Sequence, residues 1–308
     1  MSLKAVKSKI KAVNKTGQVT KAMEAVSAAK MRKTQEWALS ARPYAFSALR
    51  ILRKIVSDNT LEKNTLIALG GEEKYENPLF IVLTSDRGLA GSLNASVLRQ
   101  LQKFITDSDL PKSSSFMTYG RKGTEFLSSR GFNIISKNPS LPDRISIDQI
   151  REITGEAIEL IKNEEVDSVY VIYSNFISTF AQEPAIRQVF PISMQEVEKS
   201  LEGIRPARGK FADLYVKDDS VSNSPYTFEP DAESVLETLL PFLAEVMIFH
   251  SALESKASEH SARMVAMKSA GDKAKEMVKD LTRIYNKERQ SMITREMSEI
   301  IGGIESLK

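Results

Sequence analysis

The sequence contains no cysteine and only two histidines among its 308 residues. The absence of cysteine excludes disulfides, thiolate metal sites, cysteine nucleophiles and dithiol switches within this chain. His250 and His260 are ten positions apart, which is not the spacing of four that places two metal ligands on one helix face. No Gly-x-Ser-x-Gly elbow and no Ser/His/Asp set is present either. We therefore expect no catalytic residues, no metal and no cofactor.

Long apolar runs are also missing. The longest, Leu239–Phe249, contains Pro241 and Glu245 and is shorter than the roughly 20 residues of a membrane span. The lysine-rich N-terminus lacks the apolar segment of a secretory signal. These absences predict a soluble protein that is kept in a reducing compartment.

Charge is present in ordinary amount but is unevenly spread. The net charge is only +3, yet Met1 to Lys33 holds nine Lys or Arg and a single acid, Glu24. Such a segment indicates an anionic partner. A basic coiled coil that binds nucleic acid is one interpretation, since Lys and Arg release counterions from phosphates. No helix-turn-helix, zinc knuckle or aromatic platform accompanies the segment, which favours instead a basic face turned towards acidic protein surfaces.

Residues 1–58 have the apolar period of a coiled-coil helix. The first seam positions recur every three or four residues, at Leu3, Val6, Ile10 and Val13. After a break near Gly17, the stripe is predicted to continue through Val19, Met23 and Val26. Pro43 predicts a kink or the start of a second helix.

Residues 75–195 read as an α/β globular domain. Apolar or β-branched runs predict strands at Leu79–Thr84, Phe116–Tyr119 and Ser168–Phe176, with a possible edge hairpin at Arg187–Ile192. Helical patterns between them predict helices at about 93–106, up to about Gly131, and at about 146–163. Alternating strands and helices are typical of a mostly parallel, Rossmann-like sheet. Residues 196–229 are irregular and polar, as in a linker.

Residues 230–308 predict one very long coiled-coil helix that starts near Pro230 and ends at Gly302-Gly303. Some seventy residues at 1.5 Å each give about 105 Å, which is too long to bury in a domain of this size. The seam alternates steps of four and three through Val246, His250, Leu253, Ala257, His260, Met264, Met267, Gly271, Ala274, Val278, Leu281 and Tyr285. The N-terminal helix is the available partner, so the predicted fold is an α/β domain between two helices that form a long antiparallel coiled coil.

Two further stretches bear on function. Thr84–Asn94 (TSDRGLAGSLN) lies between a strand and a helix, where phosphate loops occur, but it lacks the third glycine and the Lys-Ser/Thr of such loops. We therefore interpret its glycines as serving a tight turn. Near the C-terminus, Met292–Ile304 carries apolar side chains on all sides of the helix, which indicates a segment enclosed by something outside the chain.

Several long motifs, in order, resemble the γ subunit of F-type ATP synthases, the central stalk of the rotary motor. They are Thr20–Lys33 (TKAMEAVSAAKMRK), Ala41–Ala45 (ARPYA), Thr84–Asn94, Ala257–Met267 (ASEHSARMVAM) and Tyr285–Gly303 (YNKERQSMITREMSEIIGG). The resemblance covers both helical ends and the first strand and loop of the domain.

The resemblance implies a non-catalytic subunit, present in one copy per complex, whose coiled coil enters a ring of α and β subunits. The globular base would rest, with the ε subunit, on a membrane ring of c subunits, and nucleic acid would not be a partner. Rotation of the shaft would couple ion flow to ATP synthesis or hydrolysis. The location implied is the cytoplasmic face of a bacterial cell membrane, or the matrix face in a mitochondrion.

Carried over residue by residue, the resemblance implies that one set of side chains contacts the catalytic ring: Met23, Lys30, Arg263, Arg289, Gln290 and Thr294. It places Met23, Arg263, Gln290 and Thr294 near one level of the shaft. It assigns the bearing tip to Met297, Ile300, Ile301 and Ile304. Gly17 departs from the long polar residue usual in the family and costs about 1 kcal/mol of helix stability relative to Ala. The chloroplast branch carries a cysteine-bearing regulatory insertion, and without cysteine we expect no redox control of that kind here.

Overall fold

The computed structural model describes residues 2–57, 76–107, 114–192, 229 and 231–305. The chain divides into two compact units. The first combines Met1–Ser27 with Arg263–Lys308, and the second is Ala28–Ala262. Both boundaries fall inside long helices, so each unit contains parts of the same two helices.

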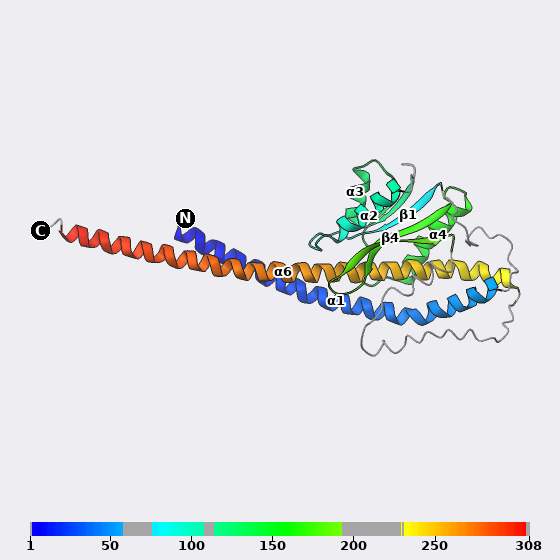
Figure 1. The fold of residues 1–308 in the computed structure, drawn as a ribbon, viewed down its shortest axis with the longest axis horizontal. Coiled ribbons are helices and arrows are strands. Elements are labelled where there is room, and N and C mark those ends of the chain that lie inside the picture. Colours follow the sequence, from blue (N-terminus) through cyan, green and yellow to red (C-terminus); the bar gives the residue numbers. More distant parts are fainter. Residues whose placement is uncertain (1, 58–75, 108–113, 193–228, 230, 306–308) are drawn as a thin grey trace. The chain divides into compact units, whose positions relative to one another are not determined.

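The second unit is built on a five-stranded sheet in the order β3-β2-β1-β4-β5 (Figure 1). The strands are β1 (Pro78–Leu83), β2 (Ser115–Tyr119), β3 (Asn133–Asn138), β4 (Ser168–Phe176) and β5 (Gln182–Phe190). Strands β3, β2, β1 and β4 are parallel, and β5 pairs with β4 in the antiparallel sense. The mostly parallel sheet and the edge hairpin agree with the sequence prediction.

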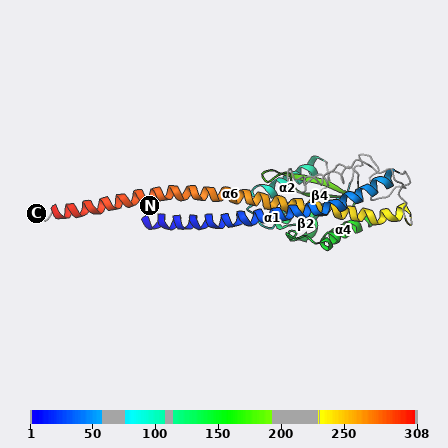
Figure 2. The same cartoon turned by 90° about the horizontal axis from the view of Figure 1, so that it is seen from below.

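Side chains of β1 alternate between two apolar clusters, because successive residues of a strand point to opposite faces. Phe80 and Val82 face α2 (Leu93–Asp107) and α3 (Arg121–Ser128). Leu79 and Ile81 face the opposite layer. That layer contains α4 (Ile147–Lys162), the later part of α1 (Leu3–Ser57) and the first part of α6 (Ala232–Glu305) (Figure 2). Burial on both faces explains the continuous apolar run of β1.

Strand β3 was missed by the sequence analysis. Its side chains alternate between exposed and half-buried, and several of them are polar. An edge strand of this kind lacks the apolar run that identified β1 and β4. Strand β5 also begins earlier, at Gln182, than the predicted hairpin segment.

The long helices are more continuous than predicted. Helix α1 runs unbroken for 55 residues, so Pro43 neither ends it nor starts a second helix. Helix α6 runs for 74 residues through Pro241 and through Gly302-Gly303, which was predicted as its end. Asp231 caps its start by accepting a hydrogen bond from the backbone N–H of Ser234 at 2.8 Å. Pro230 and residues 193–228, which include most of the predicted linker, lie outside the described residues.

All positions of the seam predicted on α6, from Val246 to Tyr285, are buried or half-buried. On α1 the predicted continuation was wrong at Val19 and Val26, whereas Met23 is half-buried as predicted. Val19 and Val26 are 52% and 54% exposed. Thr20 and Ser27 are buried, with 7% and 3% exposed. The steps of three and four therefore continue through Gly17 without a break.

Within the first unit, small residues mark where the two helices approach. A Cβ atom on Gly17 would lie 3.5 Å from Cβ of Ala274, and one on Gly271 would lie 3.3 Å from Oγ1 of Thr20. In Figures 1 and 2 the C-terminal end of α6 continues beyond the N-terminus of α1.

Helix α6 also departs from the expectation that no stretch is apolar enough for a membrane. An 18-residue window within Glu233–Ile301 reaches a mean hydropathy of 1.4, although 56% of that window is buried inside the chain. The core helix of a water-soluble protein passes the same test when it is mostly buried.

Candidate functional site

The carboxyl ends of three neighbouring parallel strands bring polar segments to one edge of the sheet. Residues 84–94 follow β1, residues 120–124 follow β2, and residues 139–143 follow β3. Open α/β sheets bind ligands at the carboxyl ends of their strands, so the polar groups at this edge form the candidate site.

The loop after β1 uses its polar groups internally. The side chain of Asn94 accepts a hydrogen bond from the Ser85 N–H at 3.1 Å and donates one to Ser85 Oγ at 2.8 Å. Ser85 Oγ in turn donates to the carbonyl of Arg87 at 2.7 Å. Leu89 and Gly91 both have positive φ angles, of 64° and 58°. The segment is a tight strand-to-helix turn, as the sequence predicted.

Asp86 ties this turn to the two neighbouring loops. Its carboxylate accepts hydrogen bonds from the N–H of Arg121 at 2.9 Å and from the N–H and Oγ of Ser140, both at 3.0 Å. Burial raises the pKa of Asp86, but these donors and the charge of Lys256 outweigh it and hold the pKa below its ordinary value. The carboxylate is therefore a structural acceptor rather than a proton donor or acceptor for chemistry.

An open cavity of about 560 Å³ lies beside Asp86. Arg87, Arg121 and Lys137 contribute three cations to its lining, so its charge favours an anion. The Arg121 side chain is 64% exposed and also pairs with Glu125 at 3.4 Å. Charges on such an open surface are screened by salt, and an anion bound there would be held weakly.

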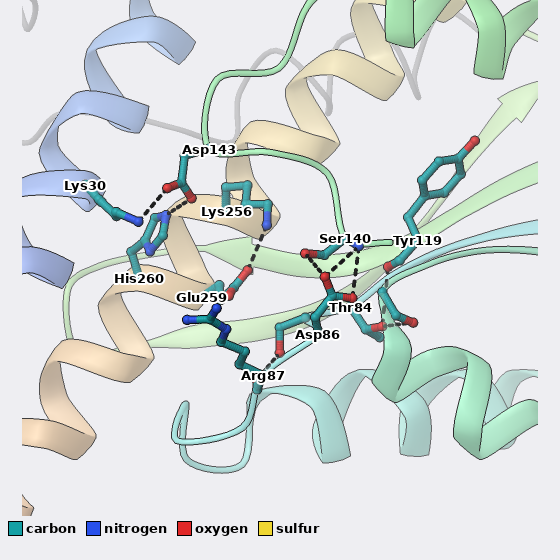
Figure 3. A network of polar contacts seen from close by, with 12 residues as sticks. Lys30, Thr84, Asp86, Arg87, Tyr119, Ser140, Asp143, Lys256, Glu259 and His260 are labelled. Carbon is teal, nitrogen blue, oxygen red and sulfur yellow. Dashed lines mark hydrogen bonds and ion pairs between the residues drawn. The ribbon is translucent and has the colours of Figure 1, made fainter. Parts of the chain in front are cut away.

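A second polar cluster joins the loop after β3 to both long helices (Figure 3). Asp143 Oδ2 lies 2.7 Å from Lys30 Nζ on α1, and Asp143 Oδ1 lies 2.9 Å from His260 Nε2 on α6. Beside it, Lys256 and Glu259 form a largely buried ion pair at 3.1 Å. One loop carboxylate thus holds two helices that are more than two hundred residues apart in the sequence.

The protonation states in this cluster follow from burial and charge. Burial raises the pKa of Asp143, but the hydrogen bond from Lys30 and the neighbouring cations bring the pKa below its ordinary value. Burial lowers the pKa of His260 by more than Asp143 raises it. At neutral pH the ring is therefore uncharged, and its Nε2–H donates to the ionised carboxylate.

Two serines attach the same stretch of α6 to the sheet. Ser258 Oγ donates to the carbonyl of Ser174 in β4 at 2.8 Å, and Ser261 Oγ donates to the carbonyl of Thr179 in the β4–β5 turn at 2.6 Å. Both serines are fully buried. Polar contacts from three parts of the domain therefore converge on residues 258–261.

The structure separates several of the predicted ring contacts. Lys30 is half-exposed and bonded to Asp143, while Met23 and Arg263 are half-buried. Arg263 and Gln290 lie on one continuous helix and are 27 residues apart, which corresponds to about 40 Å at 1.5 Å per residue. They cannot share one level of the shaft, so that expectation was wrong.

The C-terminal part of α6 brings the remaining predicted residues together. Arg289, Gln290 and Thr294 occupy successive turns and are exposed, and Thr294 Oγ1 donates to the carbonyl of Gln290 at 3.0 Å. The apolar residues Met297, Ile300 and Ile301 are also exposed. The side chain of Ile304 lies outside the described residues.

Sequence reasoning missed Asp143 altogether and interpreted His260 only as a packed seam residue. No local pattern marks an Asp in the stretch LPDR (Leu141–Arg144), because its partners are distant in the sequence. The basic position of Lys30 was noticed, but its partner lies within the same chain.

Comparison with known proteins shows which protein family the chain is related to. A family model described as ATP synthase matches residues 2–307. An ATP synthase gamma chain of Chloroflexus aurantiacus is 37% identical over 309 residues, covering 99% of each chain. One from Symbiobacterium thermophilum is 37% identical over 305 residues, covering 99% of this chain and 98% of that one.

Solved structures agree at the level of the fold. A chain of the Euglena gracilis mitochondrial ATP synthase (OSCP/F1/c-ring, rotational state 3) superposes with a TM-score of 0.62 at 17% identity, covering 99% of this chain and 94% of that one. A chain of the Tetrahymena thermophila mitochondrial ATP synthase central stalk and c-ring gives 0.55 at 20% identity, covering 82% and 99%. The continuous match over nearly all of its length shows that the chain belongs to the family of ATP synthase gamma chains.

Proposed function

We propose that this chain is the rotor shaft, or central stalk, of an F-type ATP synthase. The observation that carries the proposal is a 74-residue helix whose side chains become exposed on all sides over its last described turns, in a chain of the ATP synthase gamma family. Family membership favours this role over the alternative of a basic nucleic-acid-binding coiled coil.

The shaft itself is an antiparallel coiled coil of α1 and α6. Supporting this, buried positions recur at steps of three and four on both helices. Gly17 approaches Ala274, whereas Thr20, further along α1, approaches Gly271, earlier in α6. Residue numbers that rise along one helix while they fall along its partner indicate that the two helices run antiparallel. In this scheme residues 1–58 and 230–308 are the shaft, 75–195 the base and 196–229 the linker.

The tip turns inside a sleeve made by the α and β subunits. Met297, Ile300 and Ile301 are apolar and exposed, and an apolar surface of this kind marks a contact with another protein. Met23, Lys30, Arg263, Arg289, Gln290 and Thr294 supply the contacts to the ring at different heights. The base meets the ε subunit and the c-ring at a membrane, in a complex of which this chain is a peripheral, non-catalytic member.

The non-catalytic role has a direct test. The loop after β1 uses its polar groups within its own turn and, through Asp86, on the two neighbouring segments, and the cavity beside it is open. Calorimetric titration of the isolated chain with Mg-ATP should therefore show no stoichiometric binding in the micromolar range. Such binding would contradict a purely mechanical subunit.

The ring contacts are tested in the assembled complex with the double substitution Arg289→Ala and Gln290→Ala. Both side chains are exposed, so the chain should fold and assemble normally. Loss of a charged hydrogen bond costs on the order of 1.5–3 kcal/mol, so ATP synthesis and hydrolysis should fall about tenfold or more. The matched control is Gln102→Ala with Lys103→Ala on the exposed side of α2, which should leave both rates unchanged. Unchanged rates in the Arg289/Gln290 variant would mean that torque passes elsewhere along the shaft.

A further inference from the structure

We propose that Asp143 is a positioning residue of the rotor, which locks α1 and α6 to the α/β domain against twisting at the level where both helices leave it. We call Asp143, Lys30, His260, Ser258 and Ser261 the collar. The inference rests on the proposed rotor function, and it adds a specific place where torque passes between base and shaft.

The collar lies close to the end of the second compact unit on both long helices. The second compact unit begins at Ala28 and ends at Ala262. The two partners of Asp143 are Lys30 and His260, each two residues inside one of these boundaries. At 1.5 Å per residue, the collar lies within about 3 Å, along each helix, of the point where the unit ends. Asp143 therefore holds both helices within one helical turn of the end of the second unit.

At the collar, α6 is held from more than one direction. Successive residues of an α-helix are about 100° apart around its axis. Measured around the axis of α6, His260 is therefore about 100° from Ser261 and about 160° from Ser258. The serines bind carbonyls of β4 and the β4–β5 turn, whereas His260 binds the loop after β3. Contacts on two sides of a helix resist rotation about its axis, since turning in either direction breaks at least one of them.

One carboxylate is shared between the two helices. The His260 side chain is only 4% exposed, whereas Asp143 and Lys30 are 42% and 48% exposed, so the His260 contact is shielded from water on one side and the Lys30 ion pair is open to it. The other oxygen of the same carboxylate takes Lys30 at 2.7 Å. A single side chain thus connects two helices and a loop, and neither helix can twist without moving it (Figure 3).

The test measures torsional stiffness in the assembled complex. The tip of the shaft is held by the ring in an inhibited, non-rotating state, and the angular fluctuations of a bead on the α/β domain are recorded. Asp143→Ala should widen the angular distribution, and Asp143→Asn, which can still accept from His260, should widen it less. Asp143→Glu keeps the carboxylate and should restore much of the stiffness. The matched control is Asp148→Ala, which removes an exposed carboxylate five residues away and should leave the distribution unchanged.

Thermal melting of the isolated chains separates positioning from simple stability. A loss of stiffness in Asp143→Asn at a melting temperature near that of the unchanged chain supports the proposal. An unchanged angular distribution in both Asp143→Ala and Asp143→Asn would overturn it, whatever happens to the melting temperature. Failure of the rotor function would look different. In that case, the complex with the unchanged chain would not rotate when ATP is added. If only the collar proposal fails, the unchanged complex rotates and the variants keep its torsional stiffness.

Discussion

At the scale of single residues, the tightest constraint lies where β2 ends, at Gly120. Its φ angle is 113°, a region that side chains rarely adopt, and a Cβ atom there would collide with the carbonyl of Thr84. The segment that follows β1 and the start of α3 therefore lie in close contact, and Thr84 Oγ1 accepts a hydrogen bond from the N–H of Gly123 at 2.9 Å. The close approach allows Asp86 to reach both neighbouring loops.

Substitution of this glycine should cost stability. We expect Gly120→Ala to lower the free energy of unfolding by roughly 1–3 kcal/mol, because it adds backbone strain to a steric clash. Gly155→Ala is the matched control, since it lies within α4 and has no atom within 4 Å of an added Cβ. The control should gain about 0.5–1 kcal/mol from helix propensity. Chemical denaturation of the three proteins measures this, and equal stabilities would contradict the described geometry.

The burial of His260 predicts a fold that loses stability in acid. Its pKa is lowered from the ordinary value of 6.5, chiefly by burial. The unfolded chain therefore binds a proton at a higher pH than the folded chain, and stability rises with pH between the two values. The contribution of the uncharged His260 to the free energy of unfolding is complete above pH 6.5 and is lost as the pH falls through the lowered pKa of the folded chain. Replacement by His260→Gln, which can still donate to Asp143, should flatten this part of the stability curve; an identical pH dependence in both proteins would rule out the assignment.

At the scale of elements, the seam of α1 shows how far the sequence could be interpreted. Leu3, Val6, Ile10 and Val13 were identified because apolar residues mark the period. Beyond them the period continues through the half-buried Gly17 and the buried Thr20 and Ser27, which are small or polar and carry no hydrophobic signal, with Met23 as the half-buried apolar residue between them. Two helices approach closely only where their side chains are small. Small residues lack the apolar periodicity from which a seam is predicted, so this contact could not be predicted from the sequence.

Gly17 offers a prediction at this scale. An added Cβ would meet Ala274 Cβ at 3.5 Å, which is ordinary van der Waals contact. Gly17→Ala should therefore stabilise the first unit by about 0.5–1 kcal/mol through helix propensity. Gly271→Ala should gain less, because its Cβ would lie 3.3 Å from Thr20 Oγ1. Hydrogen exchange of the amides around residue 17 should slow in Gly17→Ala, and faster exchange would show that the helices cannot accept the methyl group.

The end of α6 gives a second prediction at the element scale. Side chains from Ser291 to Ile301 are all exposed, so the free helix has no packing to protect its amides. In the isolated chain this segment should exchange its amide hydrogens quickly, whereas the buried stretch Leu236–Leu253 should be protected. Protection of the tip should appear on assembly with the ring. Strong protection in a demonstrably monomeric free chain would contradict the bearing role.

The same distinction applies to the sheet and the collar. Strands β1 and β4 were predictable because their buried apolar runs are local signals, and the long helix α6 was predictable from a period sustained over almost six heptads. Strand β3 and Asp143 were not, because an exposed edge strand and a single loop carboxylate acquire their roles only from distant neighbours. Local periodicity thus predicts elements, while contacts across the fold require the structure.

At the scale of the whole molecule, the two compact units are joined by continuous helices rather than by loops. Boundaries between domains usually lie in exposed linkers, but here they fall between Ser27 and Ala28 and between Ala262 and Arg263, inside α1 and α6. Continuous helices carry a twist from one unit to the other more directly than a flexible linker does. This construction suits a part that turns.

The most direct test of the rotor function is to observe rotation. Because the chain has no cysteine, Lys103→Cys on the exposed side of α2 creates a single attachment point for a bead or fluorophore. The labelled chain is assembled with the α and β subunits of its own complex, the ring is fixed to a surface, and Mg-ATP is added. We predict unidirectional, ATP-dependent rotation of the probe. A complex that hydrolyses ATP at its normal rate while the probe stays at a fixed angle would contradict the central claim.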